Sequence, residues 1–449
     1  MRILGFGGNQ LAAGGYEVAN SLRFDDGSSD YLDRTPASAS NRKTWTFSCW
    51  VKRGNLTGAQ QHIIQMFPAG TGYTRVFFEN DESLSCDGTD SSAGNAFELT
   101  TNRLFRDVSA WYHIVVALDT TQGTASNRLK IYVNGIQETS FETETYPAEN
   151  IDYQINNNEQ HNIGRYNGGS EYFDGYMAEV VLIDGQQLAP TEFGEFDEDT
   201  GIWKPIDVSG LTFGTNGFYL PFENSGALGQ DDSGNGNNFT VNNLTSIDQS
   251  TDTCTNNFAT ANALDLSGGN LSEGNTKLTA DGGWDGVRAT IHYPSSGKWY
   301  AELYVNSRST GVSVGVLRTD KTILGDLAND SGGYIYNSGD GQKYNNGGNS
   351  AYGATWGTGD TISVLWDADT NTLVFYKNGV SQGTAWSGLT GEYGLAFNCN
   401  GSDSATINFG NPSVTISSGN ADGNGYGNFE YSVPSGYYAL NTKNLAEYG

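Results

Sequence analysis

A ten-residue phrase occurs twice in this chain of 449 residues, once in each half. Residues 127–136 read NRLKIYVNGI and residues 371–380 read NTLVFYKNGV, with Asn, Leu, Tyr, Asn and Gly at matching places. Asn-Gly between two apolar runs is the strongest short signal for a β-hairpin, because a type I′ turn needs a positive φ at both central residues. Each half of the chain is therefore expected to build an equivalent hairpin.

The residues before each Asn-Gly alternate in character, as they do in a strand with one buried face. Tyr132 and Tyr376 are expected on the outer face of their strands. The positions expected on the buried face are Leu129, Ile131, Val133, Leu373 and Phe375. Two strands of the same design indicate two related architectures in tandem.

Short alternating runs such as WTFSCWVKR, WYHIVVAL, KWYAELYV and TISVLW make up much of the chain. Gly (60 residues), Asn, Asp or Pro separates most of them, which is the pattern of an all-β protein. Because a single core stops growing at roughly 250–300 residues, we predict two tandem antiparallel β-sandwiches. The tryptophans expected in their packed interiors are Trp45, Trp50, Trp111, Trp299 and Trp366.

Composition divides the chain into four segments. Residues 1–16 are Gly-rich and aperiodic, so they are expected to be an anchor that is ordered on a partner surface. Residues 17–205 and 263–449 carry the strand patterns of the two sandwiches. Residues 206–262 are polar and rich in Gly and Asn, and we interpret them as a connector that lies against its neighbours. One short helical turn is expected before Pro205.

Charge and cysteine content exclude several classes of partner. With 23 basic and 51 acidic residues the net charge is −28, which opposes binding to nucleic acid or to an anionic membrane. No stretch is long enough to span a bilayer, and the first residues make a poor signal peptide. The four cysteines form no CxxC pair and are expected to be buried free thiols, which fits assembly in a reducing cytoplasm. They are Cys49, Cys86, Cys254 and Cys399.

The strand wording resembles two known families. SLRFDDGSSDYLDRTP, WTFSCWVKR, WYHIVVALDT, LKIYVNGIQ and YFDGYMAEVVLID are similar to a laminin-G-like, concanavalin A-type jelly roll over residues 17–200. SGKWYAELYV, GYIYNSGDGQKYNNGG, GDTISVLWDADTNTLVFYKNG and YGLAFN resemble a SPRY domain over residues 263–445. Both families are two-sheet sandwiches, so the resemblance implies two jelly rolls after a short Gly-rich anchor.

The order of these parts is similar to that of virion proteins of tailed bacteriophages, especially marine ones. This resemblance implies a tail fibre, capsid fibre or decoration protein that is assembled in the host cytoplasm and located in the virion. It also implies that residues 1–16 bind other virion structural proteins. A homo-oligomer is expected, a trimer by analogy with phage fibres.

Aromatic and amide side chains gather in the loops of the second half. Sugars present flat C–H faces that stack on Tyr and Trp, while amides and carboxylates bind their hydroxyl groups. In SPRY domains the loops at one end of the sandwich form the binding surface, and this region includes such a loop. The candidate glycan-binding residues are Tyr334, Tyr336, Tyr344, Asn345, Asn346, Trp356 and Trp386. For Tyr336 and Trp356 the alternative is a place in the core.

Three acids in the stretch FDDGSSD, Asp25, Asp26 and Asp30, offer the hard oxygen ligands that Ca²⁺ prefers. Laminin-G-like sandwiches sometimes bind calcium. These acids lack the spacing of a known calcium loop, and in an acidic protein such a cluster is ordinarily a solvated turn. We therefore expect no cofactor and no resident metal, with Ca²⁺ as the one candidate ion.

Catalysis is considered at the run EFGEFDED, residues 192–199, because glycosidases on this fold use closely spaced carboxylates. Glu195 and Asp197 have the first spacing, but Thr200 stands where the third acid would be. No GxSxG, Cys–His or P-loop signature occurs. The histidines form no metal motif: His62, His113, His161 and His292. We expect a protein that is not an enzyme.

Three functions remain open at this stage. The favoured one is an adhesin that binds host cell-surface polysaccharide through loops of the SPRY-like domain. The second is a particle-decorating protein without a host ligand, and the third is a polysaccharide depolymerase.

Overall fold

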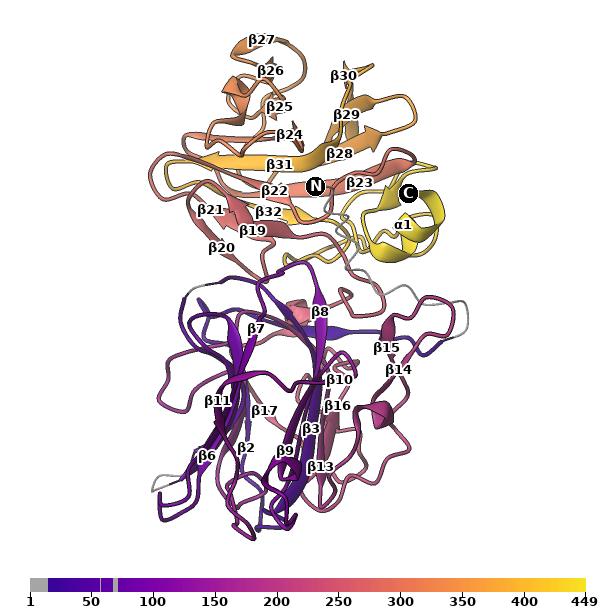
Figure 1. Cartoon of the computed structure of the whole chain (residues 1–449). Coiled ribbons are helices and arrows are strands. Elements are labelled where there is room, and N and C mark those ends of the chain that lie inside the picture. The colour runs from indigo at the N-terminus through magenta and orange to yellow at the C-terminus, as the bar shows by residue number, and fades with distance from the viewer. Residues whose placement is uncertain (1–14, 57, 68–71) are drawn as a thin grey trace. The chain divides into compact units, whose positions relative to one another are not determined.

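The computed structural model describes residues 15–56, 58–67 and 72–449 (Figure 1). All but the last two residues of the expected anchor lie outside these ranges. The fold is all-β, as the sequence predicts. Among the described residues one α-helix occurs, α1 (Thr442–Tyr448), and no helix is long and apolar enough to cross a membrane.

The chain divides into two compact units, residues 1–255 and 256–449, which are described separately. The first unit contains a sheet with the order β10-β9-β8-β3-β13-β1-β18, in which β16 also pairs with β13. Its strands are β1 (Ser21–Phe24), β3 (Thr44–Arg53), β8 (Trp111–Asp119), β9 (Leu129–Val133), β10 (Ile136–Gln137), β13 (Gly175–Asp184), β16 (Phe218–Leu220) and β18 (Gln249–Ser250).

The second sheet of this unit has the order β11-β7-β6-β5-β4-β12-β2-β17. Its strands are β2 (Tyr31–Arg34), β4 (Gln61–Met66), β5 (Tyr73–Phe78), β6 (Ser83–Thr89), β7 (Phe97–Leu104), β11 (Phe141–Thr145), β12 (His161–Ile163) and β17 (Thr240–Asn242). A separate small hairpin joins β14 (Gly194–Phe196) to β15 (Trp203–Pro205). The 3₁₀ turns are Ala125–Asn127, Pro190–Glu192 and Ser246–Asp248, of which the second lies where the helical turn is expected.

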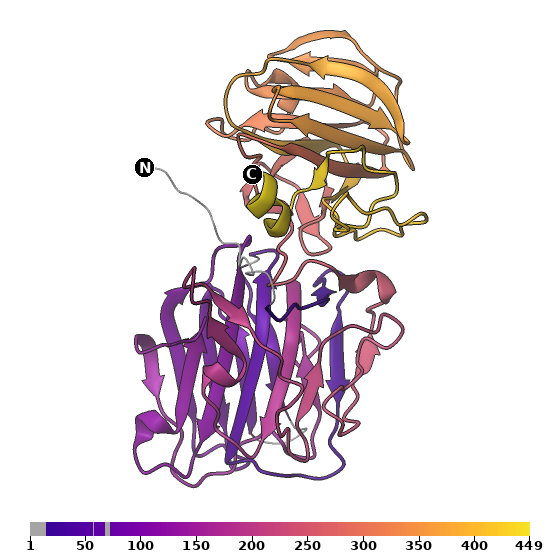
Figure 2. The same ribbon diagram turned by 90° about the vertical axis from the view of Figure 1, so that its right-hand side faces the viewer.

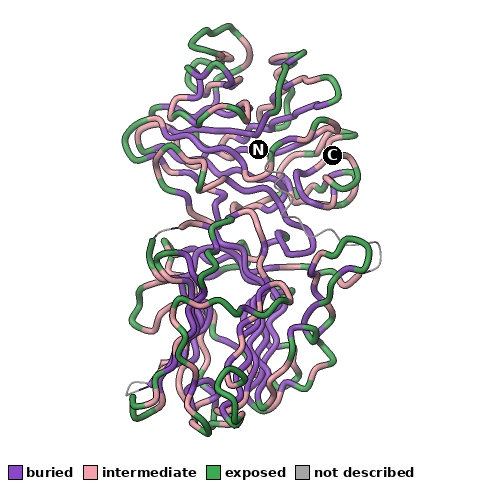
Figure 3. Tube along the Cα trace, viewed as in Figure 1, coloured by how far each residue is buried: buried purple, intermediate pink, exposed green. Residues whose placement is uncertain are grey.

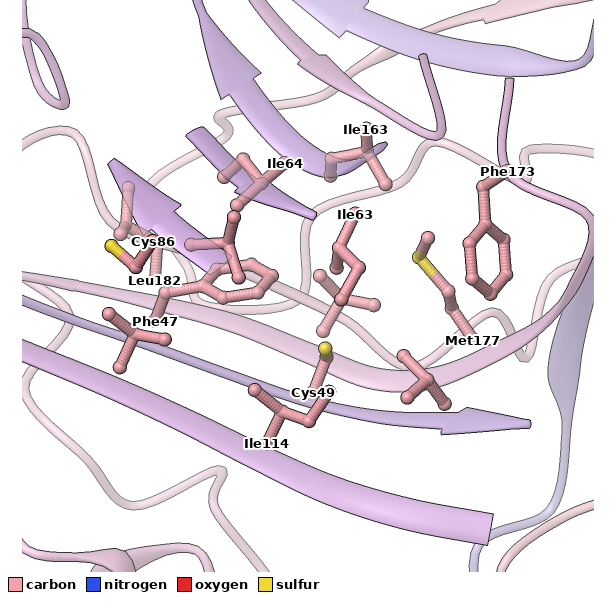
Figure 4. Packing of buried hydrophobic residues seen from close by; sticks show 14 of the residues in the cluster. Phe47, Cys49, Ile63, Ile64, Cys86, Ile114, Ile163, Phe173, Met177 and Leu182 are labelled. Atoms are coloured by element: carbon pink, nitrogen blue, oxygen red, sulfur yellow. The ribbon is translucent and has the colours of Figure 1, made fainter. Parts of the chain in front are cut away.

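Apolar side chains of both sheets fill the interior of the first unit. Phe47 and Ile114 come from one sheet and Ile64 and Ile163 from the other (Figure 4). Figure 3 shows that burial follows the strands, whereas the exposed positions lie mostly in the connecting loops. All four cysteines are buried and free, as predicted. The five tryptophans expected in the packed interiors are also buried, each 5% exposed or less.

The second unit contains two sheets, seen in Figures 1 and 2. One has the order β19-β22-β31-β24-β25-β26-β27 and the other β20-β21-β32-β23-β28-β29-β30, in which β33 pairs with β23. The strands of the first are β19 (Ala261–Leu266), β22 (Trp284–Ala289), β24 (Gly311–Arg318), β25 (Gly333–Asn337), β26 (Gln342–Asn345), β27 (Gly348–Ala351) and β31 (Tyr393–Asn400). Those of the second are β20 (Asn270–Ser272), β21 (Lys277–Thr279), β23 (Lys298–Ser307), β28 (Thr361–Asp367), β29 (Thr372–Lys377), β30 (Val380–Trp386), β32 (Ser404–Asn408) and β33 (Tyr438–Ala439). A 3₁₀ turn, Leu327–Asn329, precedes β25.

The repeated phrase forms the same hairpin at the edge of a sheet in both units, as predicted. β9–β10 is followed across its sheet by β8 and β3, and β29–β30 by β28 and β23. Asn134 and Asn378 have φ values of 48° and 49°, as a type I′ turn requires. The side chain of Asn134 accepts a hydrogen bond from the N–H of His113 (2.8 Å), and that of Asn378 from the N–H of Thr361 (2.9 Å).

Residues 206–255, most of the expected connector, are built into the first sandwich. β16 pairs with β13, β17 with β2 and β18 with β1. These strands have only two or three residues each, so their period-two pattern is too short to stand out from the surrounding Gly and Asn. Along the chain the two units therefore divide after Thr255, within the expected connector of residues 206–262.

In each unit an irregular segment packs on the outer face of the hairpin-bearing sheet. In the first, Phe193 and Phe213 cover Val115 and Val181. In the second, Phe429 covers Tyr300, with ring centroids 5.0 Å apart. Because this face is buried too, residues expected to point outward, such as Tyr132 and Tyr376, are partly buried.

Candidate functional site

The sheet edges that meet at one end of the second sandwich carry several partly exposed aromatic rings. Tyr334 lies on β25 of one sheet and Trp386 on β30 of the other, and their rings meet edge to face at 5.5 Å. Tyr334 also meets Tyr393 at 5.9 Å. Strand alternation aims Tyr334 and Trp386 at each other from the two sheets, so these two partly exposed residues, distant in sequence, form one surface above the buried Tyr393. We call this surface and the hairpin next to it the aromatic edge; its residues are Tyr334, Asp340, Lys343, Tyr344, Asn346, Tyr352 and Trp386.

Lys343 of β26 ties the two sheets together at this edge. Its Nζ lies 5.2 Å from the ring centroid of Trp386 and 5.9 Å from that of Tyr352. The same ammonium donates a hydrogen bond to the carbonyl of Ala385. A cation held over aromatic faces is a stabilising arrangement, and it places one positive charge in an otherwise acidic protein.

The β26–β27 hairpin carries the other polar candidates. The Tyr344 hydroxyl donates to Asp340 and accepts from the amide of Asn349 (3.3 Å). Asn345 donates to the carbonyl of Gly333 (2.8 Å) and thus fixes the hairpin. Asn346 is the turn residue, with a φ of 52°, and its side chain is exposed. Asn346 is thereby presented to solvent at the tip of a short hairpin, whereas Tyr344 is partly exposed and packs against the cluster that contains Leu317 and Ile335.

Tyr336 and Trp356 do not belong to this surface. They are 0% and 2% exposed, and their ring centroids lie 5.6 Å apart within the core of the second unit. The Tyr336 hydroxyl donates to the carbonyl of Ala354, so its polar atom has a partner inside the fold. Both residues are thus removed from the candidate set, because a sugar cannot reach them. The Gly-rich sequence around them resembles an exposed loop, but the rings turn inward.

Three carboxylates that could hold a metal ion meet in the first unit. Atoms of Asp25, Asp26 and Asp174 lie within 4.8 Å of one another. Asp174 is fully buried, and its Oδ2 has no hydrogen-bond partner among the described residues. Burial and the two neighbouring acids raise the pKa of Asp174 well above its usual range. Three hard oxygens at this spacing fit Ca²⁺, which takes carboxylate ligands.

The third carboxylate of this cluster is Asp174, whereas the sequence pattern predicts Asp30 beside Asp25 and Asp26. The Oδ2 of Asp30 instead accepts a hydrogen bond from the backbone N–H of Asp25 (3.0 Å) and closes the turn. Burial raises the pKa of Asp30 to about 7. A sequence signal for Asp174 does exist, since Phe-Asp-Gly at 173–175 echoes Phe-Asp-Asp-Gly at 24–27.

A buried Ser–His pair in the first unit superficially resembles a nucleophile and its base. Ser48 Oγ lies 2.8 Å from Nε2 of His113, and Nδ1 of His113 accepts from the indole N–H of Trp203 (3.0 Å). Burial lowers the pKa of His113 to about 3, so the imidazole is neutral. Because Nδ1 accepts, the proton is on Nε2 and is donated to Ser48. The pair is therefore in the tautomer that cannot take a proton from serine.

In EFGEFDED, Glu192 ends a 3₁₀ turn and the other acids lie on the β14–β15 hairpin. Backbone and side-chain hydrogen bonds from Thr200, together with the nearby Lys204 ammonium, lower the pKa of Asp197 to about 2. Lys204 lies 3.1 Å from Asp197 and 3.3 Å from Glu195. Asp197 is thus ionised across the working pH range and cannot serve as the protonated acid that a glycosidase needs.

Comparison with known proteins gives a match for each unit. Residues 26–192 match the family described as the concanavalin A-like lectin/glucanases superfamily (Laminin_G_3). Residues 298–412 match the SPRY domain family. The first unit thus contains a laminin-G-like domain and the second a SPRY domain. Domains of these two kinds are typically non-catalytic binding domains.

Solved structures similar to this chain include SPRY domains. The SPRY domain of human HERC1 is 21% identical over 33% of this chain and 96% of that one, with a TM-score of 0.30. A human SPRY domain is 16% identical over 29% and 90% of the two chains, with a TM-score of 0.27. The TRIM65 PSpry domain is 13% identical over 33% and 91%, also with a TM-score of 0.27.

Proposed function

We propose that this protein is a non-enzymatic structural and adhesion protein of a phage virion, and that its SPRY domain binds glycans of the host surface. The observation that carries the glycan part is the aromatic edge. There Tyr334 and Trp386 are partly exposed beside Lys343. Tyr344 is partly exposed on the other face of the same sheet, beside the carboxylate of Asp340. Rings of this kind stack on sugar faces, and the polar groups bind hydroxyls.

The virion part of the proposal rests on the order of the domains and on the charge. A net charge of −28 keeps a protein that is made in many copies soluble. In this proposal residues 1–16 bind another virion protein and the chain assembles as a homotrimer. Several copies on one particle then turn weak single contacts into useful adhesion through effective concentration.

A glycan array probed with the full chain in multivalent form tests the adhesin. We expect binding to a subset of bacterial surface glycans, weakened about fivefold in Tyr344→Ala, which loses a stacking face of about 1 kcal/mol. Tyr344 is partly exposed and packs against a small buried cluster apart from the main core of the unit, so urea unfolding of the variant checks that its fold is intact. Tyr172→Ala, at a partly exposed ring of the first unit, is the matched control and should bind normally.

Two outcomes of this experiment contradict the proposal. No binding at high avidity would favour a decoration protein without a host ligand. Shortened chains after incubation with host polysaccharide would identify a depolymerase.

The virion part is tested by mass spectrometry of purified phage particles, together with the native mass of the full chain. A particle without the protein, or a strict monomer, would contradict that part.

A further inference from the structure

In each unit one position on the outer face of the hairpin-bearing sheet lies under the irregular segment that packs on this face. We call that segment the covering segment. His113 of β8 and Thr361 of β28 correspond, because each exchanges hydrogen bonds with the Asn of its Asn-Gly turn. Across the sheet the register pairs His113 with Trp50 and Thr361 with Tyr304. The same position in two related sandwiches can therefore be compared directly.

In the first unit a side chain of the protein fills this point. The imidazole of His113 stacks between Trp50 (4.7 Å, 24°) and Trp203 (5.9 Å, 23°). Trp203 comes from the covering segment and packs on the turn, since a Cβ at Gly135 would lie 2.4 Å from its ring. No space for a water molecule remains among the surrounding residues. One flat ring thus lies between two aromatic walls.

In the second unit the same point is open. Tyr431 takes the place of Trp203 on the turn, since a Cβ at Gly379 would lie 2.7 Å from its ring. Tyr304 stands where Trp50 stands, but the short side chain of Thr361 replaces the imidazole. The result is a cavity of about 210 Å³ that Tyr304, Thr361 and Tyr431 help to line. At the position where the first unit has a ring, the second thus has open space that two tyrosines help to line.

The polar groups around this cavity select against anions. Glu302, 2% exposed, accepts hydrogen bonds from the Tyr300 hydroxyl (2.7 Å) and from the backbone N–H groups of Glu430 and Tyr431 (2.9 Å each). The Glu430 side chain is held by the backbone N–H of Ser417 (2.7 Å). No basic residue is among the lining residues that the structure describes. Two fixed carboxylates and no cation favour a ligand rich in hydroxyl donors.

The outer wall of the cavity lies beyond the segment that matches the SPRY family. This wall comes from residues 414–417 and 430–431, whereas the match to the SPRY family ends at residue 412. The wall carries the hydroxyl of Thr415, which makes no hydrogen bond within the described part of the chain. The volume lies below the roughly 300–1,000 Å³ of pockets that enclose drug-sized ligands, so it suits a single ring.

We infer that this cavity binds one ring of a neutral sugar, held between Tyr304 and Tyr431 in the place that His113 occupies in the first unit. Stacking supplies the contact with the sugar face, and Glu430, Thr361 and Thr415 offer partners for its hydroxyls. The choice of a sugar rests on the proposed function, whereas the cavity and its aromatic walls are independent of it.

Saturation-transfer NMR of the full chain with glucose, galactose, mannose and N-acetylglucosamine tests the inference. At least one sugar should give a saturable signal. Thr361→His rebuilds the filled arrangement of the first unit and should weaken binding at least about tenfold, as the loss of one stacking partner and one hydroxyl predicts. Thr384→His, at an exposed position of β30, is the matched control and should bind like the parent.

Thr415→Trp closes the cavity from the opposite, exposed wall and keeps the test valid if Thr361→His folds poorly. Binding by none of the sugars, or undiminished binding in both cavity variants, would overturn the inference. So would binding of tetramethylammonium or imidazole in place of the sugars. Tyr344→Ala affects only the aromatic edge, so a failed glycan array with intact monosaccharide binding would contradict the proposed function alone.

Discussion

The two sandwiches share a framework and differ in what lies under its cover. In both, an Asn-Gly hairpin ends the same sheet, and an aromatic ring, Trp203 or Tyr431, packs on the glycine of the turn. The first unit closes the space beneath with His113, whereas the second leaves it open above Thr361. The Asn-Gly hairpin thus gives both units the same local backbone arrangement, and the side chain at position 113 or 361 decides whether the space next to it is filled or open.

Exchange of the side chains at positions 113 and 361 should produce the largest difference in stability between the two units. His113→Thr removes a buried ring and leaves the Trp203 indole and Ser48 without their partner, so it should destabilise the protein by about 3 kcal/mol. Thr361→His enters existing space and should change stability by less than about 1 kcal/mol. Urea unfolding measures both. Equal costs would mean that the two positions are not equivalent.

Each unit has a buried glutamate on the covered face, and the two differ in their hydrogen-bond donors. Glu179 accepts from the hydroxyls of Tyr16 (3.1 Å) and Tyr219 (2.8 Å), and burial raises its pKa to about 7. Because the pKa of Glu179 is higher in the folded state than in the unfolded state, the protonated carboxyl contributes to the free energy of unfolding at low pH. This contribution is lost as the pH rises from about 4.5 through about 7. Glu179→Gln should therefore gain up to about 3 kcal/mol over the parent between pH 5 and pH 8.

Glu302 supplies the contrast within the second unit. Burial raises its pKa too, but its carboxylate accepts two backbone N–H groups. An amide NH₂ cannot accept, so Glu302→Gln should cost about 1–3 kcal/mol even at pH 8. Glu195→Gln, at an exposed site, is the control for both variants. If the free energy of unfolding of Glu179→Gln and of the parent changed with pH in parallel, the raised pKa of Glu179 would be refuted.

The two turn glycines, Gly135 and Gly379, should differ in how much stability an alanine substitution costs. Gly135→Ala and Gly379→Ala both place a Cβ at positive φ and against a ring. Trp203 is 4% exposed and held by His113, whereas Tyr431 is partly exposed and has room to move. We expect costs of about 2 kcal/mol for Gly135→Ala and about 1 kcal/mol for Gly379→Ala. A larger cost at Gly379 in thermal unfolding would reverse this ranking.

Calcium should affect only the first unit, because the single acidic triad among the described residues lies there. A ligand at ten times its Kd stabilises by about 1.4 kcal/mol. Thermal unfolding with added Ca²⁺ should show this gain in the parent and lose it in Asp174→Asn. Asp281→Asn, at an exposed acid of the second unit, is the control. If Ca²⁺ stabilised Asp174→Asn as much as the parent, the three carboxylates would be excluded as the calcium site.

Local pattern was sufficient to predict much of the fold. Alternation and Asn-Gly placed the hairpins, and the inward set at Leu129, Ile131 and Phe375 is buried. The strands of residues 206–255 escaped prediction because two or three residues in a polar context carry no period. Tyr336 and Trp356 show the same limit, since composition alone does not tell an aromatic residue in a loop from one in the core.

The cavity could not be predicted because it depends on register and on a distant cover. Only strand pairing sets Tyr304 beside Thr361, and only the fold brings Tyr431 over both. One signal did exist. Glu302 interrupts the apolar run KWYAELYV, and a charge inside a strand of this kind marks a face that has a polar partner.

A crystal structure of the full chain soaked with a neutral hexose at saturating concentration tests the central claim most directly. We expect density for one sugar ring between Tyr304 and Tyr431, while the imidazole of His113 occupies the equivalent place in the first unit. A collapsed or empty cavity, with sugar bound elsewhere or nowhere, would contradict it.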